Sequence, residues 1–232
     1  DLNKLYGKEI IKDNKKVIYG NDDLQSFTLT RFMAPELMSD EGRSIVIDPD
    51  IFATYSDVWE LFSIDMSSNS ALMRQHNNKK DWGTSVMLLE NSNFKHWKIK
   101  DIVDDLLSQK IDYRDWMGLR NEKEKIGILS NEWNSYDELT ESTKLLHNTL
   151  RITQPWRAGL DVDFVPKKMK PLFGFISREW AHTLLGRNPL VHREHPDQNQ
   201  TNFFFGHLKK AIEDGVIDYD LIINAIKLEH IR

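Results

Sequence analysis

Two aspartates separated by a proline, Asp48-Pro49-Asp50, are the residues of this chain best placed to do chemistry. They follow directly on a short apolar run, Ser44-Ile45-Val46-Ile47, which predicts a strand buried on both faces, as in a parallel α/β sheet. Side chains repeat every two residues in a strand, so both carboxylates would point to the same side. Two carboxylates there can hold a hard divalent cation and leave positions open for a diphosphate. The same tripeptide is also a good turn sequence.

A histidine much further along the chain offers a third ligand. His147 ends another short apolar run, Leu145-Leu146, and Arg151 and Arg157 follow it closely. An imidazole beside two carboxylates would favour Mn²⁺ over Mg²⁺, because histidine suits transition metals. The plainer interpretation is a histidine that packs or caps at the end of a strand.

Strands and helices are predicted to alternate around these residues and then to give way to helices. Residues 1–22 are polar and irregular, and a helix begins near Asp23 that Pro35 should kink or end. This order predicts the α/β class, as a sandwich around a mixed sheet with a helical C-terminal region. The other predicted elements are a helix opened by Asp57, a strand over 85–89, an amphipathic helix marked by residues 102–107, and helices capped by Ser177, Asp197 and Asp218.

The composition excludes several classes of protein. A net charge of −5 and a pI near 5.9 argue against a nucleic-acid partner, which usually requires a basic surplus. The absence of cysteine excludes disulfides, zinc-thiolate sites and thiol catalysis. No apolar stretch approaches the roughly 20 residues needed to span a bilayer, and no signal peptide is recognisable, so we expect a cytoplasmic protein.

The motifs named so far occur in an informative order. Ile45-Val46-Ile47-Asp48-Pro49-Asp50, followed by His147-Asn148-Thr149 and Gln154-Pro155-Trp156, resembles the GT-A-fold glycosyltransferases. The closest match is the family-8 type, related to glycogenin and the bacterial galactosyltransferases. The resemblance implies that Asp48, Asp50 and His147 bind Mn²⁺ (or Mg²⁺), which grips the diphosphate of the donor.

Three further segments extend the resemblance over about residues 23 to 160. The segment 26–31 looks like the helix before the Asp-x-Asp motif, and implies that Arg31 lies near the donor. The segment 82–88 is similar to the part that touches the donor sugar, which implies contacts from Thr84 and Ser85. Residues 126–129 with Trp133-Asn134 resemble the strand and the Trp-Asn step before the histidine motif.

The chain also departs from the family pattern. Gln154 stands where the family has a lysine that neutralises diphosphate, a charge that Arg151 or Arg157 could supply. The acidic segment near the acceptor is poorly matched, and Asp115 is the nearest candidate, with a solvated charge at a helix end as the alternative. Only 47 residues precede Asp48, so the nucleotide-binding unit expected there is either incomplete in this chain, rebuilt or lost.

Taken together, the resemblance implies a catalytic core over residues 1–165 with an incomplete nucleotide-binding part, and a mainly helical extension over 166–232 packed on it. It implies transfer of a sugar from a UDP-sugar or similar donor to a glycan, lipid or protein acceptor, with retention. A homo-oligomer is possible. The residues implied to bind the donor and its metal are Arg31, Asp48, Asp50, Thr84, Ser85, His147, Arg151, Gln154, Trp156 and Arg157.

Alternative interpretations stay open from the sequence. A non-catalytic binding or scaffold protein derived from a glycosyltransferase would explain the incomplete upstream unit and Gln154. A haloacid-dehalogenase-type phosphatase also places Asp-x-Asp after an apolar strand, but it requires Thr or Val where this chain has Phe52. The polar cluster His192, Arg193, His195 and Asp197 could form a second metal site, or more simply a loop leading into a helix cap.

Overall fold

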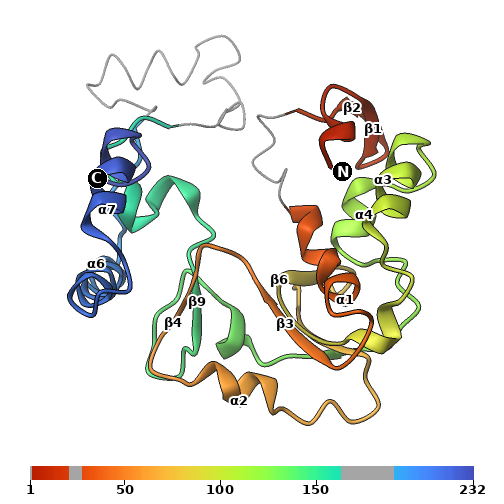
Figure 1. Cartoon of the computed structure of the whole chain (residues 1–232), viewed down its shortest axis with the longest axis horizontal. Helices are drawn as coiled ribbons and strands as arrows, with labels where there is room; N and C mark the ends of the chain where they lie inside the picture. The colour runs from red at the N-terminus through yellow and green to blue at the C-terminus, as the bar shows by residue number, and fades with distance from the viewer. Residues whose placement is uncertain (1, 21–27, 163–190) are drawn as a thin grey trace, which may run out of the picture. The chain divides into compact units, whose positions relative to one another are not determined.

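The computed structural model of the chain describes residues 2–20, 28–162 and 191–232, which form two compact units (Figure 1). The first unit extends to His147 and the second runs from Asn148 to Arg232. The domain boundary predicted between residues 165 and 166 lies outside the described residues. Within the described part, no helix is both long and apolar enough to cross a membrane.

A four-stranded mixed sheet forms the centre of the first unit. The central pair, β5 and β6, is flanked by β3 beside β6 and by β7 beside β5. β6 is antiparallel to both of its neighbours, whereas β5 and β7 are parallel. The predicted α/β class with a mixed sheet is therefore confirmed, as are the strands predicted at 85–89 and 126–129. The bounds are β3 (Arg43–Ile47), β5 (Ala71–Gln75), β6 (Trp82–Glu90) and β7 (Ile126–Ile128).

The strand before Asp48 differs from the prediction. β3 pairs antiparallel with β6 and lies at the edge of the sheet, so it is not a strand of a parallel sheet buried on both faces. Its residues are half-buried, and Ile47 is 45% exposed. The buried central strand is β6, whose seven inner residues are all buried. An apolar run alone does not distinguish an edge strand from a central one.

A smaller, three-stranded sheet begins directly after Asp50. β4 pairs antiparallel with β9, and β8 pairs parallel with β9. The turn over residues 48–50 links the two sheets: the Asp48 amide donates to the Ser85 carbonyl of the larger sheet at 3.0 Å, and the Ile51 amide donates to the Asp48 carbonyl at 3.2 Å. The bounds are β4 (Ile51–Ala53), β8 (Ser135–Tyr136) and β9 (Leu145–His147).

Residues 2–20 are ordered, contrary to the irregular segment predicted there. β1 (Glu9–Lys12) and β2 (Lys15–Ile18) form a hairpin. It lies against α3 (Ile99–Leu107) and α4 (Tyr113–Met117) in Figure 1. Asp13 and Asn14 make the two-residue loop with φ of 53° and 59°. Both residue types tolerate positive φ, which the tightest hairpin turns require. This dipeptide was the signal for the hairpin in the sequence.

The main hydrophobic core lies between this hairpin, the larger sheet and the helices of the first unit. Leu5, Ile10 and Tyr19 of the N-terminal segment are at most 2% exposed. Phe32 and Trp97 meet edge-to-face at 5.0 Å between ring centroids. A second cluster contains residues of both sheets and of the short helix between them, among them Leu61, Val86 and Leu145.

Short helices connect these strands. Residues 23–27 of the helix predicted from Asp23 lie outside the described residues, and Pro35 lies in the first turn of α1 and does not end a helix. Asp57 caps α2 as predicted, because its side chain accepts from the Trp59 amide at 2.8 Å. The helices of this unit are η1 (Leu2–Leu5), η2 (Thr28–Met33), α1 (Ala34–Leu37), α2 (Val58–Phe62), η3 (Asn91–Phe94), α3 (Ile99–Leu107), α4 (Tyr113–Met117) and η4 (Asn131–Asn134).

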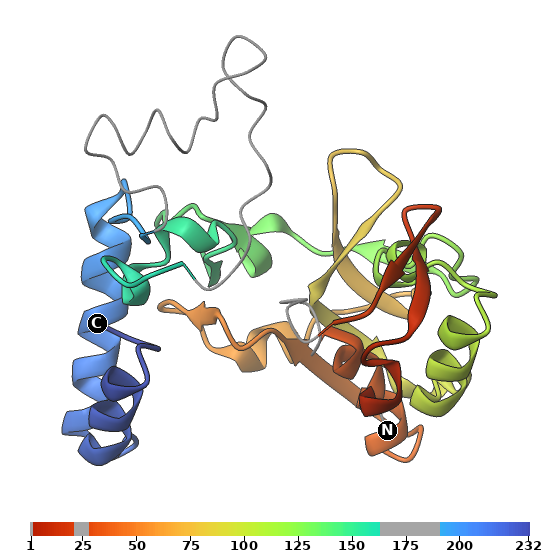
Figure 2. The ribbon, with the colours of Figure 1, turned by 90° about the horizontal axis from the view of Figure 1, so that it is seen from above.

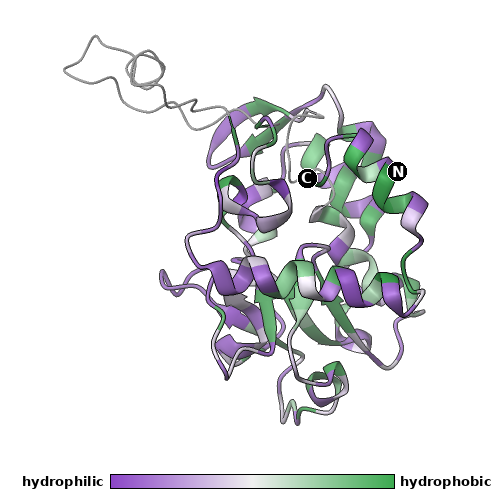
Figure 3. Ribbon diagram, turned by 90° about the vertical axis from the view of Figure 1, so that its left-hand side faces the viewer, coloured by the Kyte–Doolittle hydropathy of each residue, from purple (hydrophilic) through white to green (hydrophobic). Residues whose placement is uncertain are grey.

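The described part of the second unit is mainly helical. α6 (Gln198–Glu213) and α7 (Tyr219–Lys227) follow each other, as Figure 2 shows, and begin at the predicted caps Asp197 and Asp218. The predicted cap Ser177 lies outside the described residues. Two short turns, η5 (Arg151–Thr153) and η6 (Pro155–Arg157), precede them, and η6 packs on α6. Hydrophobic and hydrophilic residues are mixed along α6 in Figure 3.

Candidate metal centre

The three predicted metal ligands lie together in the first unit. One ligand atom from each of Asp48, Asp50 and His147 lies within 4.8 Å of the others. His147 Nε2 is 3.5 Å from Asp50 Oδ1. Among residues 2–20, 28–162 and 191–232, this is the one group of three such side chains with that spacing, and His192 and His195 do not belong to such a group.

Strand pairing explains why residues a hundred positions apart converge. The turn over residues 48–50 leads directly into β4, and Ile51, the first residue of β4, is paired with His147 of β9. The histidine is therefore placed opposite the end of the Asp-Pro-Asp turn by backbone hydrogen bonds and not by local sequence. Asp48 and His147 are buried, and Asp50 is half-buried.

A buried asparagine orients the imidazole of His147. His147 Nδ1 lies 3.1 Å from Asn134 Oδ1, and Asn134 Nδ2 donates to Ser85 Oγ at 3.0 Å. Because the Asn134 amide nitrogen donates to Ser85, the Asn134 oxygen is the atom that faces His147 and accepts a hydrogen bond from it. Nδ1 of His147 therefore carries the proton, and Nε2 faces Asp50. Burial, reinforced by Arg31 and Arg74, lowers the pKa of His147 to about 4. The imidazole is therefore neutral near pH 7, the form that binds metals.

An arginine fixes Asp48 from the other side. Arg31 donates from Nε to Asp48 Oδ1 at 2.7 Å and from Nη2 to Oδ2, a bidentate pair. Its Nη1 donates to Thr84 Oγ1 at 2.9 Å. Burial raises the pKa of Asp48 and Arg31 lowers it, with burial the larger effect. The predicted donor residues Arg31, Thr84 and Ser85 are thus linked by hydrogen bonds to the ligand trio.

The donor set fits a divalent cation. It offers carboxylate oxygens from two residues and one neutral imidazole nitrogen, a mixture that suits Mn²⁺ and other transition metals as well as Mg²⁺. Each carboxylate oxygen has two lone pairs, so Asp48 can bind a cation while it is paired with Arg31. Asn134 is the outer residue that such a histidine ligand usually requires.

Two residues beside this trio were not predicted from the sequence. The Tyr136 ring packs edge-on against His147 at 5.5 Å between centroids, and the Arg74 guanidinium lies 3.9 Å from the centre of the Tyr136 ring. Arg74 also donates to the Asn134 carbonyl. Tyr136 is two residues beyond the Trp-Asn step, which is a local signal. For Arg74 we find no signal in the sequence, because β5 itself was not predicted.

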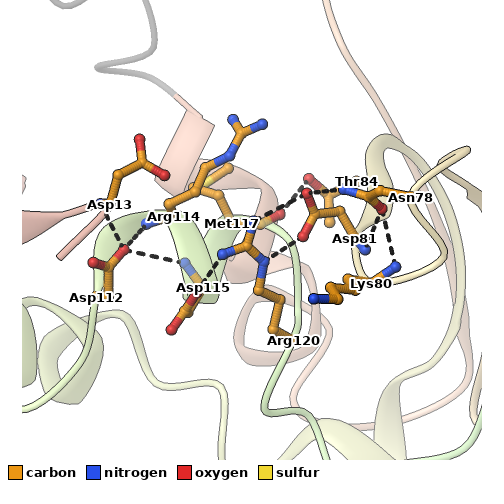
Figure 4. A network of polar contacts seen from close by, with 10 residues as sticks. All are labelled: Asp13, Asn78, Lys80, Asp81, Thr84, Asp112, Arg114, Asp115, Met117 and Arg120. Carbon is orange, nitrogen blue, oxygen red and sulfur yellow. Dashed lines mark hydrogen bonds and ion pairs between the residues drawn. The ribbon is translucent and has the colours of Figure 1, made fainter.

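Asp115 lies in a different environment from the trio. It is in the first turn of α4 and accepts from Arg120 Nη1 at 2.7 Å. Arg120 also forms a bidentate pair with Asp81, as Figure 4 shows. Asp115 is therefore an ion-pair partner, about one third exposed, and it is not a member of the ligand group. Its catalytic role stays a prediction.

Four predicted donor residues belong to the second unit. Gln154 is buried there and donates to the Asn148 carbonyl at 3.1 Å, and the Trp156 ring packs on Phe204 at 5.0 Å between centroids. Arg151 and Arg157 lie in η5 and η6. Donor binding by these residues stays a prediction.

The polar cluster before α6 also has a structural role. The Asp197 side chain accepts from the Asn199 amide at 3.0 Å and so caps α6. His195 Nδ1 accepts from the Asp197 amide at 3.1 Å. His192 Nδ1 lies 2.8 Å from the Arg151 carbonyl. These contacts agree with a loop that leads into a helix cap.

Comparisons with known proteins give structural neighbours only. No protein-family model matches the chain. No curated protein matches it either.

Among solved structures, the chain is similar to the glycosyltransferase GlyE of Streptococcus pneumoniae TIGR4, with 18% identity and a TM-score of 0.45 over 56% of this chain and 38% of GlyE. It is similar to the galactosyltransferase LgtC, with 10% identity and a TM-score of 0.43 over 56% of this chain and 60% of LgtC. It is also similar to mouse xyloside xylosyltransferase 1, with 11% identity and a TM-score of 0.37 over 65% and 70%.

These three neighbours are glycosyltransferases, the class predicted from the motifs. The chain spans less than two thirds of the length of GlyE and LgtC. Because the TM-scores lie below 0.5, these likenesses carry no argument about the function of this chain.

Proposed function

We propose that this chain is a metal-dependent glycosyltransferase that uses a nucleotide-diphosphate sugar, with UDP as the nucleotide and Mn²⁺ (or Mg²⁺) as the cation. The observation that carries the proposal is the convergence of Asp48, Asp50 and His147 within 4.8 Å at the junction of the two sheets. The motif order in the sequence supplies the reaction class.

The chain's own residues prepare the site for a diphosphate. Asp48, Asp50 and His147 would hold the cation, which would offset the charge that develops on the departing nucleoside diphosphate. Arg31 holds Asp48 through a bidentate pair, and Asn134 holds the His147 ring, so neither ligand must reorient when the cation binds. Retention of configuration is proposed from the family resemblance alone.

The remaining donor contacts are proposed from the motifs. Thr84 and Ser85 follow Gly83 on β6 and are buried beside the trio, and the motif resemblance is the ground for proposing that they contact the donor sugar. Arg151 and Arg157 would supply the positive charge that Gln154 lacks, and Trp156 would pack near the donor. Asp115 would act near the acceptor, which we propose to be a glycan, a lipid or a protein.

Calorimetric titration of UDP, with and without Mn²⁺, tests the proposal. We expect binding that requires the metal, and an affinity on the order of 100-fold lower in His147→Ala, since even residues behind a ligand contribute about 10- to 100-fold. His96→Ala is the matched control, because His96 pairs with Glu122 at the surface and is not in the ligand group. Absent or metal-independent UDP binding would contradict the proposal.

Turnover separates the enzyme from its alternatives. A glycosyltransferase should slowly hydrolyse its UDP-sugar when no acceptor is present, and this hydrolysis should require the metal. Metal-dependent UDP binding with no cleavage of any UDP-sugar would favour the non-catalytic binding protein. Hydrolysis of a generic phosphate ester in place of UDP-sugars would favour the phosphatase.

A further inference from the structure

A polar pocket of about 290 Å³ lies beside the candidate metal centre, in the first unit. Its walls include two arginines, Arg74 and Arg114, together with His76 and Tyr136. All of them come from the end of β5, the loop after it, α4 and β8. The proposed donor site does not use this pocket, so its chemistry requires a separate explanation.

The pocket carries a surplus of positive charge. Among the residues that the structure describes, none makes a side-chain hydrogen bond or ion pair with the Arg114 guanidinium, and no dashed line reaches it in Figure 4. Asp81 also lines the pocket, but Arg120 pairs with it from outside, and Asn78 Nδ2 donates to it at 2.8 Å. Arg120 and Asn78 therefore already occupy the Asp81 carboxylate, which Arg114 attracts only through space, and neither Arg74 nor Arg114 forms an ion pair with another described residue.

The loop that forms one wall is held in place before any ligand binds. The His76 amide donates to the Asp81 carbonyl at 3.0 Å, and Asn78 Oδ1 accepts from the Lys80 and Asp81 amides at 2.9 and 3.0 Å. The His76 ring lies 5.8 Å from the Tyr136 ring. A ligand would thus meet a preformed wall, which reduces the ordering required on binding.

The pocket and the metal ligands share supporting residues. Tyr136 lines the pocket and packs edge-on against His147. Arg74 lines the pocket and donates to the carbonyl of Asn134, whose side chain orients His147. The ring of Tyr136 would therefore separate a molecule in the pocket from His147.

We infer that this pocket binds an anionic group, a phosphate or a carboxylate, carried by the acceptor. Guanidinium groups recognise both anions through paired N–H donors, and an arginine without a partner has those donors to offer. The inference rests on the proposed function, because only a transferase has an acceptor. The diphosphate of the donor is the other possible source of the anion, and the experiment separates the two.

The test measures binding of inorganic phosphate without metal, by calorimetry, to the wild type, Arg114→Gln and Arg43→Gln. We expect at least a tenfold loss of phosphate affinity in Arg114→Gln and none in Arg43→Gln. Arg43 is the matched control, since it is a partly exposed arginine that pairs with Glu90 and does not line the pocket. No measurable phosphate binding to the wild type, or equal affinity in Arg114→Gln, would overturn the inference.

A competition titration identifies the source of the anion. If the pocket serves the acceptor, UDP with Mg²⁺ will bind without displacing phosphate, and His147→Ala will lose UDP but keep phosphate. Displacement of phosphate by UDP with Mg²⁺ would assign the pocket to the donor and overturn the inference. Because the phosphate measurement requires neither UDP nor metal, it can succeed or fail independently of the proposed function.

Discussion

Two sets of aspartates in the first unit have very different surroundings. Asp48 and Asp50 converge with His147, so that ligand atoms of three residues face a common point. Asp81 and Asp112 each face donors supplied by the protein itself, the first from Arg120 and the second from backbone amides. Asp48 is paired with Arg31 much as Asp81 is paired with Arg120, so what distinguishes the first set is the convergence of further ligand atoms, and that convergence is what can hold a cation.

Asp112 is the clearest structural member of the second set. Its side chain accepts from the amides of Asn14 and Arg114 at 2.8 and 2.7 Å, and from those of Asp13 and Asp115 at longer distances. It thereby caps α4 and joins that helix to the N-terminal hairpin. Burial alone would raise its pKa, but these four amides lower it below its usual range.

The difference also explains the environment of Asp115. It shares Arg120 with Asp81, so its carboxylate is used by an ion pair (Figure 4). Aspartates with the same side chain therefore have different roles, which are set by the residues that the fold places around them.

The largest expected effect comes from removing a ligand. Asp50→Ala should weaken Mn²⁺ binding on the order of 100-fold, and Asp115→Ala should leave it unchanged, because only Asp50 belongs to the convergent group. Titration calorimetry with Mn²⁺ measures both. A similar loss of Mn²⁺ affinity in the two variants would contradict the distinction between the convergent aspartates and those used in ion pairs.

A second substitution should lower stability and leave Mn²⁺ binding unchanged. Asp112→Ala removes the acceptor of four backbone amides and should lower the free energy of unfolding by about 2–3 kcal/mol. Asp105→Ala, which removes an exposed ion pair with Lys110, should cost less than about 1 kcal/mol. Urea denaturation with and without Mn²⁺ checks both values. An equal cost in both variants would contradict the structural role of Asp112.

A third change tests the packing behind the metal ligands. A Cβ at Gly83 would lie 2.6 Å from the Tyr136 hydroxyl and 3.2 Å from the Arg74 carbonyl oxygen. Gly83→Ala should therefore lower the free energy of unfolding by about 1–2 kcal/mol. Gly206→Ala, within α6 and with nothing within 4 Å, should raise it by up to about 1 kcal/mol. Thermal or urea unfolding gives the sign of the change in the free energy of unfolding. The same sign in both variants would refute the packing argument.

The smallest effect is a dependence on pH. The hydrogen bond from Arg120 lowers the pKa of Asp81 to about 2, below its usual value of 3.8. A depressed pKa contributes stability above about pH 4, and this contribution is lost as the pH falls toward 2. We expect about 1 kcal/mol, because the Arg120 side chain is partly exposed. Between pH 4 and 2, the free energy of unfolding of Asp81→Asn should depend less steeply on pH than that of the wild type. An equal dependence in both proteins would argue against a stabilising Asp81–Arg120 pair.

The sequence by itself determined which residues could bind a metal and in what order their motifs occur. Asp48, Asp50 and His147 could be selected because each lies at the end of an apolar run, and those runs are indeed the strands β3 and β9. The caps Asp57, Asp197 and Asp218 were equally readable, since capping depends on residues within one turn.

Only the tertiary structure decided which polar residues work together. The pairing of Ile51 with His147, the edge position of β3 and the approach of Arg74 to Tyr136 all depend on contacts between segments distant in sequence. The same is true of Asp112, whose amide donors come from both its own helix and a loop nearly a hundred residues away. Local propensity acts over a few residues, whereas the partners of a buried charge are chosen by how the whole chain packs.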